Sequence, residues 1–252
     1  MRSKRPVIAI GIAFHSAAQK LSEAVDSALA QNVPGHDIQV LVLDSSPSGA
    51  ARQLLGSRRS LPGVKVMRAN ARTAHAARNR LIAIAEARWP ELRWHVRLDS
   101  DDRFASDSAL AKALRYARPI HRAIVAGNRQ LGPEDRLIGR NIPTRSLLSR
   151  RQLLNRLSSM AAGVLKAELP SCNLILRAGL RWRYPAKKSA EDHWLLASLL
   201  LKMPKSHILV RQVEMVDYRV GGAVTLANRR QGLYLAQRIA LLEEATAWHR
   251  DD

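Results

Sequence analysis

Short apolar runs alternate with helical patterns along the first half of the chain. A short apolar run with β-branched side chains is typical of a buried strand, whereas apolar positions that recur about every three or four residues indicate a helix. The apolar runs predict strands at residues 7–12, 38–43, 64–67, 95–98 and 124–126. The patterns between them predict a helix that starts at an N-cap, Ser16, and ends near Gln31, and further helices at 50–55, 73–88 and 108–116, the last capped by Asp107.

The second half of the chain has a less regular pattern. Gly132-Pro133 predicts a turn within a hairpin over residues 131–140. The rest predicts helices at 147–157, 191–201 and 226–248, a strand at 172–176, a basic loop at 178–188 and two short strands with a break within 207–220. Because no internal repeat, low-complexity tract or linker is visible, we expect one compact unit.

The alternation of strands and helices in the first half predicts a parallel sheet with helices on both faces. In such sheets, ligands bind beyond the carboxyl ends of the strands. Two polar clusters, Asp44–Gly49 and Asp99–Asp102, directly follow predicted strands. The pattern therefore indicates that the functional site lies at this edge of the sheet.

Composition narrows the class of protein. The chain has 252 residues, with 41 Lys and Arg against 21 Asp and Glu, so that its formal net charge is +20. A hydrophobic fraction of 46% fits a globular domain and excludes global disorder. The single cysteine, Cys172, excludes an intramolecular disulfide framework and a Cys-clustered zinc site. The charge alone favours a nucleic-acid partner, but an aromatic fraction of 4% argues against binding of single strands by stacking.

Asp99-Ser100-Asp101-Asp102 places three carboxylates within four residues at a strand end. Such a cluster of like charges is usually stabilised by a cation, and oxygen ligands select Mg²⁺ or Mn²⁺, which also bridge phosphates. The alternative is a solvated acidic turn before the next helix. In a chain this basic, solubility does not explain why acids concentrate in one loop, so the residues favour a metal site.

A second acidic pair, Glu191-Asp192, opens a predicted helix and is followed by His193. Carboxylates in a first helical turn complement the helix dipole, so capping explains them without any catalytic role. The other interpretation is a general base that is held rigidly at the helix start and deprotonates a hydroxyl. The residues alone leave both interpretations open.

These clusters belong to a longer series of short motifs. In chain order they are 26–31, the Asp44 turn, Ala77-Arg78-Asn79 continuing to 85, Leu98–Asp102, Glu191-Asp192-His193 and 217–222. Their order and spacing over residues 6–225 resemble glycosyltransferase family 2. The resemblance implies an α/β fold of the GT-A type: a Rossmann-like, mostly parallel central sheet flanked by helices, with a less regular acceptor-binding second half.

The resemblance also implies an organisation and an activity. Residues 1–252 would form a single domain, with a nucleotide-sugar-binding half at 6–128, an acceptor-binding half at 129–225 and a C-terminal helix at 226–252. The activity would be inverting transfer of a sugar from a nucleotide-diphosphate donor to a hydroxyl of a glycan or glycolipid, with Mn²⁺ or Mg²⁺ as cofactor. The class is that of hexosyltransferases in cell-surface polysaccharide synthesis.

Carried over residue by residue, the resemblance implies a donor site. Asp44 would accept a hydrogen bond from the nucleobase, Arg78 would hold the nucleotide, and Asp99 would contact the ribose or a metal-bound water. Either Asp101 or Asp102 would be the direct metal ligand, with Asp99 close by. Three further donor contacts are expected at Phe14, His15 and Ser100.

The same resemblance implies the acceptor side. Asp192 would be the general base, and Glu191 would orient the acceptor. Trp182 and Tyr184 either line the acceptor site, pack in the core or belong to a mobile lid. His193 either binds the metal as a third ligand, contacts the acceptor or is held by a neighbouring carboxylate. The chain departs from the family pattern at Phe14-His15 and at Ser45-Ser46, which weakens any choice among UDP, GDP and dTDP donors.

Two alternatives remain from the sequence, a basic nucleic-acid-binding protein without catalysis and a GT-A-like nucleotidyltransferase. The second would normally show a glycine-rich basic loop after the first strand, where Phe14-His15-Ser16 stands instead. No targeting segment or stretch of about 18 apolar residues is visible. We therefore expect a cytoplasmic protein, with peripheral contact at the inner face of the membrane as an option, because basic residues concentrate between 145 and 188.

Overall fold

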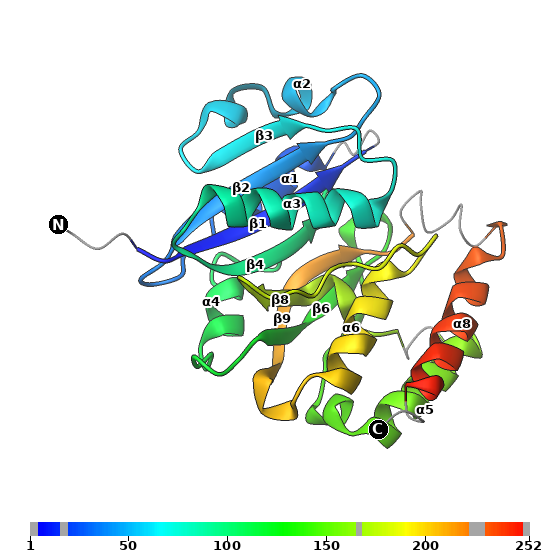
Figure 1. Cartoon of the computed structure of the whole chain (residues 1–252). Coiled ribbons are helices and arrows are strands. Elements are labelled where there is room, and N and C mark those ends of the chain that lie inside the picture. Colours follow the sequence, from blue (N-terminus) through cyan, green and yellow to red (C-terminus); the bar gives the residue numbers. More distant parts are fainter. Residues whose placement is uncertain (1–4, 16–19, 165–167, 222–229, 249–252) are drawn as a thin grey trace.

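The computed structural model describes residues 5–15, 20–164, 168–221 and 230–248. A curled mixed sheet forms its centre and carries helices on both faces (Figure 1). Within the described residues, the strand order is β3-β2-β1-β4-β8-β6-β9-β5, with β7 paired to β6. The α/β architecture predicted from the pattern is therefore confirmed.

The first half of the chain builds the parallel part of the sheet. Strands β1, β2, β3 and β4 pair in parallel, and span Val7–Phe14, Asp37–Asp44, Val64–Arg68 and Leu92–Asp99. The helices α1, α2, α3 and α4 span Leu21–Leu29, Ala51–Leu55, Ala74–Arg88 and Ala109–Leu114. Short 3₁₀ turns at Gly56–Ser60 and Pro133–Asp135 lie in connecting loops.

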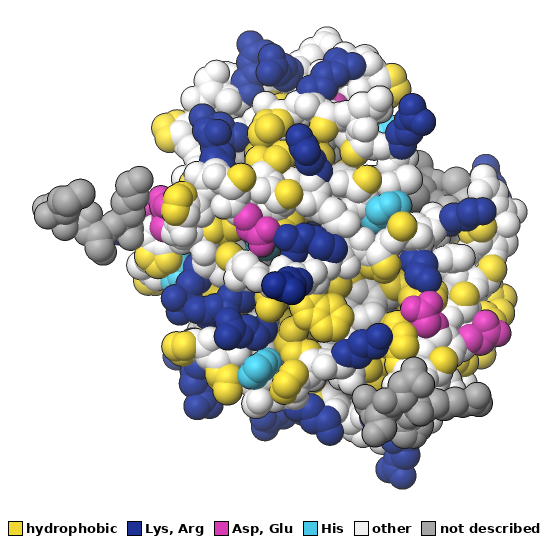
Figure 2. Space-filling view, viewed as in Figure 1, with side chains coloured by type: hydrophobic (Ala, Val, Ile, Leu, Met, Phe, Trp, Pro, Cys, Tyr) yellow, Lys and Arg dark blue, Asp and Glu magenta, His cyan; other side chains and the backbone are white. Residues whose placement is uncertain are grey.

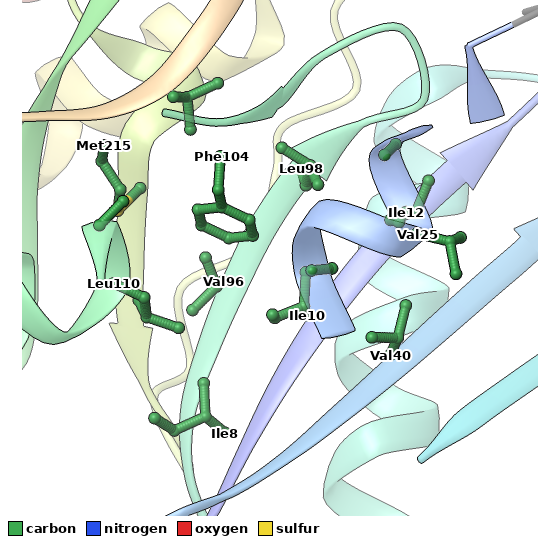
Figure 3. Packing of buried hydrophobic residues seen from close by; sticks show 14 of the residues in the cluster. Ile8, Ile10, Ile12, Val25, Val40, Val96, Leu98, Phe104, Leu110 and Met215 are labelled. Carbon is green, nitrogen blue, oxygen red and sulfur yellow. The ribbon is translucent and has the colours of Figure 1, made fainter. Parts of the chain in front are cut away.

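The side-chain alternation of β1 explains why helices cover both faces. Ile8, Ile10 and Ile12 point into the main core, which α1 and α4 close (Figure 3). Ala9 and its neighbours on the other face pack against α3. Gly11 lies under α3, where an added Cβ would stand 3.4 Å from the side chain of Leu81.

The second half adds antiparallel pairing and a second core. Strand β8 runs antiparallel to both β4 and β6, whereas β6 and β9 are parallel. Strands β5, β6, β7, β8 and β9 span Arg103–Phe104, Ala123–Leu131, Leu137–Asn141, Leu174–Arg177 and Ile208–Arg219. The second core lies beneath helices α5, α6 and α8, which span Arg150–Ala161, Glu191–Lys202 and Leu233–Ala247.

Three predicted boundaries in the second half are wrong. Residues 207–220 hold one continuous strand, β9, because two register shifts opposite Gly127 absorb the expected break. The strand predicted from Cys172 begins at Leu174, after a 3₁₀ turn. The last helix begins at Leu233, after Gly232 in the left-handed conformation, while positions 226–229 lie outside the described residues.

Two helix starts also differ. Asp107 makes no side-chain cap for α4; instead the Gln31 side chain accepts a hydrogen bond of 2.9 Å from the Leu110 N–H. The predicted helix from 147 is split at Ser149, where extended backbone separates a 3₁₀ turn from α5. The Ser16 cap lies outside the described residues. Gln31 is far from α4 in the sequence, so the local pattern around Asp107 could not indicate this hydrogen bond.

The carboxyl ends of three neighbouring strands meet at one edge of the sheet. Phe14 of β1 is in register with Asp44 of β2, and Ala13 of β1 with Asp99 of β4. Both polar clusters therefore lie at this edge, as predicted. Among the described residues, no helix is both long and apolar enough to cross a membrane.

Candidate active site

A buried arginine joins the two acidic clusters. Arg97 Nε and Nη2 donate to Asp99 at 2.8 and 2.5 Å, and Nη1 donates to Asp192 at 2.9 Å. The Arg97 side chain is only 9% exposed. Arg97 and Asp99 share a face of β4 because they lie two residues apart, and α6 brings Asp192 to the same point from 95 positions later. The structure thus unites the predicted donor loop with the predicted base.

Arg78 on α3 forms a second bridge. Its guanidinium pairs with Asp99 at 3.3 Å and with Glu191, and it lies 5.5 Å from the centre of the Tyr184 ring. Glu191 is buried, so its charge is compensated by Arg78 inside the protein. Glu191 therefore orders the site through its ion pair with Arg78. To orient an acceptor as well, Glu191 would have to bind the acceptor and Arg78 at the same time.

The start of α6 is built to hold Asp192. Ala190 adopts a left-handed backbone, and Asp192 Oδ1 accepts from the N–H of His193 at 3.0 Å. The hydroxyl of Ser171 donates to Oδ2 at 2.9 Å. Burial raises the pKa of Asp192, but Arg97, His193 and Arg78 outweigh burial and hold this pKa well below its ordinary value. Asp192 is therefore ionised at neutral pH.

Asp101 and Asp102 have the opposite electrostatic setting. Burial and the nearby Asp99 raise the pKa of Asp101, and burial together with Asp101 raises the pKa of Asp102 well above its usual range. Asp102 Oδ1 accepts from the N–H of Arg219 at 2.8 Å, but its buried Oδ2 has no hydrogen-bond partner among the described residues. Negative charge in this part of the loop is undercompensated.

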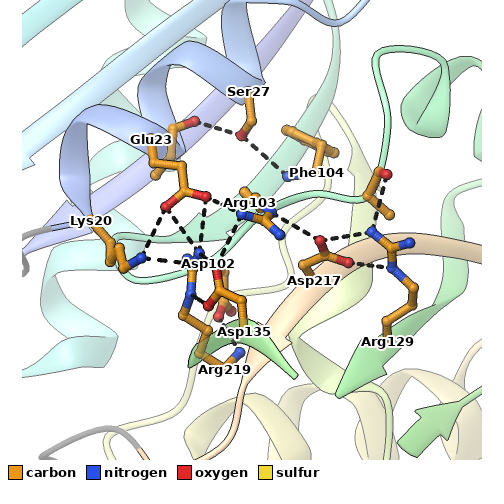
Figure 4. A network of polar contacts seen from close by, with 12 residues as sticks. Lys20, Glu23, Ser27, Asp102, Arg103, Phe104, Arg129, Asp135, Asp217 and Arg219 are labelled. Atoms are coloured by element: carbon orange, nitrogen blue, oxygen red, sulfur yellow. Dashed lines mark hydrogen bonds and ion pairs between the residues drawn. The ribbon is translucent and has the colours of Figure 1, made fainter. Parts of the chain in front are cut away.

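A network of ion pairs fixes the acidic loop from outside (Figure 4). Arg219 donates to the carbonyl of Asp101 at 2.5 Å and to Asp135 at 2.7 Å, and it also pairs with Glu23 of α1. Arg103, next to the loop, bonds to Asp217 at 2.9 Å and to Glu23. The loop is thus tied to α1, to the β6–β7 turn and to β9.

The donor set fits a divalent cation that is only partly held by protein. Asp101 and Asp102 offer hard oxygen atoms with raised pKa values, and a cation would relieve both the repulsion and the unpartnered Oδ2. Asp99 is already taken by Arg97 and Arg78. No group of three or more His, Cys, Asp or Glu side chains in the described part of the chain could hold a metal by itself, so a substrate phosphate would have to complete the shell.

The expected nucleobase contacts lie at the strand ends but differ in their availability. Asp44 is 2% exposed, and its oxygens accept from Ser46 N–H at 2.9 Å, Ser46 Oγ at 2.6 Å and Ala51 N–H at 3.0 Å. Phe14 is 1% exposed and packs in the main core. In this structure Asp44 therefore orders its turn and Phe14 supports the core.

His15 and Ser100 remain accessible at the same edge. His15 is exposed, and its Nδ1 lies 3.1 Å from the carbonyl oxygen of Ser45, which connects the ends of β1 and β2. Ser100 is half-buried within the acidic loop. These two side chains are better placed than Asp44 and Phe14 to meet a ligand.

On the expected acceptor side, most of the aromatic surface is used for packing. Tyr184 is buried in the second core, and its backbone exchanges two 2.8 Å hydrogen bonds with the Asn79 side chain. Trp182 is half-buried against the same core. His193 is buried with its Nε2 3.2 Å from Glu168, so the carboxylate-held alternative describes it.

Sequence reasoning missed three residues of this site. Arg97 stands in an apolar strand with the same parity as Asp99, which was a usable signal. Ser171 carried no signal, since it meets Asp192 only through the fold. Arg238, on the last helix, is 4% exposed and bonds to Glu168 at 2.8 and 2.9 Å, thereby connecting α8 to His193.

Comparisons with known proteins bear on this geometry. A family model described as Glycosyl transferase family 2 matches residues 9–168. The fold is similar to S. aureus TarS 1-349 in complex with UDP, with a TM-score of 0.60 and 17% identity, covering 97% of this chain and 72% of that chain. The longer S. aureus TarS chain matches with a TM-score of 0.55 and 18% identity, and this chain covers 43% of it.

A third structure shares the fold. The mannosyltransferase PcManGT from Pyrobaculum calidifontis, in complex with GDP-Man and Mn²⁺, gives a TM-score of 0.59 and 17% identity, covering 94% of this chain and 64% of that chain. No curated protein matches the sequence. At these identities the structural similarity concerns the fold, and it confirms the predicted GT-A architecture.

Proposed function

Because the chain belongs to glycosyl transferase family 2, and is thus a glycosyltransferase, we propose that it transfers a sugar from a nucleotide-diphosphate donor to an acceptor hydroxyl with inversion. Residues 6–128 would bind the donor and 129–225 the acceptor, within one domain. Family membership favours this activity over the two alternatives left by the sequence, nucleic-acid binding and nucleotidyl transfer.

The observation that carries the proposal is the contact of Asp192 with Arg97. The Arg97 guanidinium donates hydrogen bonds both to Asp192, an ionised carboxylate at a helix start, and to Asp99, the first residue of the acidic loop. Inverting transfer needs a base on one side of the sugar and stabilisation of a leaving diphosphate on the other. Asp192 and the acidic loop are the pair of groups that would supply them.

The positive charges at the strand ends support the proposed binding of a nucleotide-diphosphate donor. Arg78 and Arg97 place two guanidinium groups beside the acidic loop, where a diphosphate would gain charge-assisted hydrogen bonds. His15 and Ser100 are the accessible polar groups next to them. Asp44 would contact a nucleobase only by exchanging one of its internal hydrogen bonds.

Asp101 and Asp102 are the residues that would hold Mn²⁺ or Mg²⁺. When bound, such a cation neutralises charge that develops on the leaving diphosphate. Asp99 would act from the next position, since its carboxylate orients Arg97 and Arg78. The structurally similar proteins support this proposal, because S. aureus TarS 1-349 forms complexes with UDP and UDP-GlcNAc, and PcManGT forms a complex with GDP-Man and Mn²⁺.

Asp192 would remove the proton of the acceptor hydroxyl as the new bond forms. A sugar hydroxyl is a weak nucleophile at neutral pH, so the base must be ionised and close. Arg97 keeps Asp192 ionised, and as the proton arrives, Asp99 still balances the charge of Arg97. The acceptor is proposed to be a glycan or glycolipid, and Trp182 is the accessible aromatic side chain on that side.

A screen of nucleotide sugars for donor hydrolysis, with and without Mn²⁺ or Mg²⁺, tests the proposal. We expect hydrolysis of at least one donor that depends on the cation. Calorimetry should show metal-dependent binding of the nucleoside diphosphate product, lost in Asp101→Ala and retained in the control Asp107→Ala, which removes an exposed carboxylate from a nearby loop. Binding by Asp101→Ala equal to that of the wild type would refute the metal assignment.

A further inference from the structure

Three arginines gather at the end of the sheet opposite the candidate active site. Arg177 ends β8 in register with Trp94, near the start of β4, and its N–H donates to the carbonyl of Arg122 at 2.9 Å. Arg93 precedes Trp94 and, with Arg177, lines a surface pocket of about 400 Å³. Lys and Arg side chains crowd this side of the molecule, at the lower left of Figure 2.

The charges of Arg93 and Arg122 act on Arg177, and none of the three forms an ion pair with another described residue. Glu91 also lines the pocket, yet in the described part of the chain it forms no ion pair with them. Like charges directly opposite on neighbouring strands are destabilising, so the resting arrangement of Arg122 and Arg177 is unfavourable.

Arg177, which is half-buried, is oriented to donate hydrogen bonds. Arg177 has its Cζ 5.4 Å from the centre of the Trp94 ring, and its buried Nη1 has no hydrogen-bond partner among the described residues. Burial and the charges of Arg93 and Arg122 lower the pKa of Arg177. A ring on one face fixes the orientation of a guanidinium and leaves its N–H edge free to bind an anion.

We propose that this pocket binds a phosphate group through Arg93 and Arg177, with Arg122 at its rim. Arginine forks match the oxygens of phosphate, and a dianion would remove the repulsion among the three side chains. The same chemistry is offered by inorganic phosphate and by the headgroup of an anionic phospholipid. The site is separate from the transferase site, because Arg97 lies near the carboxyl end of β4, and Arg78 of α3 pairs with Asp99 at that end.

Calorimetry with inorganic phosphate tests the site on three proteins. We expect the Arg93→Gln/Arg177→Gln variant to bind phosphate at least about tenfold more weakly than the wild type, since charge-assisted hydrogen bonds are lost. The control Arg52→Gln, which removes an exposed charge on α2, should bind like the wild type. Equal binding by all three proteins would overturn the proposal.

Thermal unfolding separates a binding role from a structural one. In phosphate-free buffer, the double variant should unfold no lower than the wild type, and added phosphate should raise the unfolding temperature of the wild type alone. If the double variant does not fold, Arg122→Gln serves instead, because Arg122 is exposed, and it should weaken phosphate binding. Phosphate binding that Arg122→Gln leaves unchanged would then contradict the proposal.

Vesicle sedimentation identifies the source of the phosphate. If the ligand is a lipid headgroup, the wild type and Arg52→Gln will sediment with phosphatidylglycerol vesicles, and the double variant will sediment less. Vesicles of neutral phosphatidylcholine should retain none of the proteins. If the double variant and Arg52→Gln sediment equally, while the double variant still binds inorganic phosphate more weakly in calorimetry, the pocket takes a soluble phosphate.

Discussion

The two ends of the same sheet treat arginine in opposite ways. At the carboxyl end, Arg97 contacts two carboxylates, Asp99 and Asp192, at 2.5 to 2.9 Å. At the amino end, Arg177 lies opposite another arginine, and burial together with the charges of Arg93 and Arg122 lowers its pKa. The two side chains come from adjacent strands, β4 and β8, but Arg97 is buried between carboxylates, whereas Arg177 is half-buried and forms no ion pair with another described residue.

This contrast bears on the net charge of +20, because paired and unpaired arginines lie at different edges of the sheet. At the carboxyl edge, the carboxylates of Asp99, Glu191 and Asp192 hold Arg78 and Arg97 in fixed positions. At the other edge, Arg93, Arg122 and Arg177 form no ion pair with any other described residue. The described residues therefore include arginines that are paired with carboxylates, such as Arg97, and arginines that form no ion pair, such as Arg177. Each set can be changed by substitution without the other.

The largest effect should come from removing the base at the carboxyl end. Asp192→Asn keeps the shape of the side chain and one acceptor for Arg97 and Ser171, but it cannot take up a proton. We expect transfer to fall about 10²- to 10⁴-fold, the usual contribution of general base catalysis. Steady-state transfer rates with the donor found in the hydrolysis screen measure this loss.

The matched control for that variant is Asp26→Asn, which breaks an exposed pair with Arg58 away from the site. It should keep its activity. Donor binding should survive in Asp192→Asn, which separates a lost base from a lost fold. Full transfer activity in Asp192→Asn would remove Asp192 from its proposed role.

A direct test of the contrast replaces each arginine in turn. Arg97→Gln leaves two buried carboxylates without their main counter-charge, so we expect the free energy of unfolding to fall by about 3–5 kcal/mol. Arg177→Gln loses a contact with Trp94 but also loses repulsion, so we expect a change within about 1 kcal/mol. Chemical denaturation of both variants decides the matter, and equal losses would mean that the two ends do not differ.

The sequence predicted that the site lies at the carboxyl edge of the sheet, but it did not predict which charged side chains pair there. Alternating runs were enough to place Asp44 and Asp99 at neighbouring strand ends, and the Glu191-Asp192 helix start was found as such. The bond between Arg97 and Asp192 was not foreseen, because it depends on how α6 meets β4 across 95 positions. Side chains two residues apart on a strand share a face, so the alternation along β4 does place Arg97 beside Asp99.

Tertiary partners also explain what failed elsewhere. Asp107 is a good local cap, but Gln31 reaches the α4 backbone from a distant helix end. Arg238 has the spacing of a surface residue, yet Glu168 gives it a buried partner. The cross-strand position of Arg122 and Arg177 required the antiparallel register of β6 and β8, which no local pattern contains.

Within the acidic loop, Asp99 and Asp102 show the same contrast between a paired and an unpaired charged group. Asp99 balances two arginines, so Asp99→Asn should lower the free energy of unfolding by about 1–3 kcal/mol, the cost of leaving buried charged groups short of a partner. Asp102 has raised pKa and an unpartnered Oδ2, so Asp102→Asn should raise stability by about 1 kcal/mol. Thermal unfolding at neutral pH without metal compares the two, and a change of the same sign would contradict this account.

The pH dependence of stability should show both behaviours. Asp192 and Asp99 have folded-state pKa values below the unfolded value of about 3.9, so their stabilisation is complete above that pH and is lost as pH falls further. Asp101 and Asp102 have raised values, so their folded forms gain stability as pH drops from neutral towards those values. Stability should therefore rise slightly on mild acidification and then fall below about pH 4.

Urea titrations across that range measure the curve. Asp102→Asn should flatten the rise at mildly acidic pH without altering the fall below it. A wild-type curve that falls steadily from neutral pH would show that Asp101 and Asp102 are already compensated.

The smallest effect should come from the unpaired end. Arg122 is exposed and stands opposite Arg177, so Arg122→Gln removes a like-charge cross-strand pair, a change worth about 0.2–1 kcal/mol of added stability. Added salt should shrink the difference from the wild type, since screening weakens the same repulsion. Arg140→Gln makes the matched control, because Arg140 is an exposed strand arginine that pairs with Glu214, and its loss should not stabilise the protein. Denaturation at low and high salt measures both, and a loss of stability in Arg122→Gln at low salt would show that the arginines of this end do not repel one another.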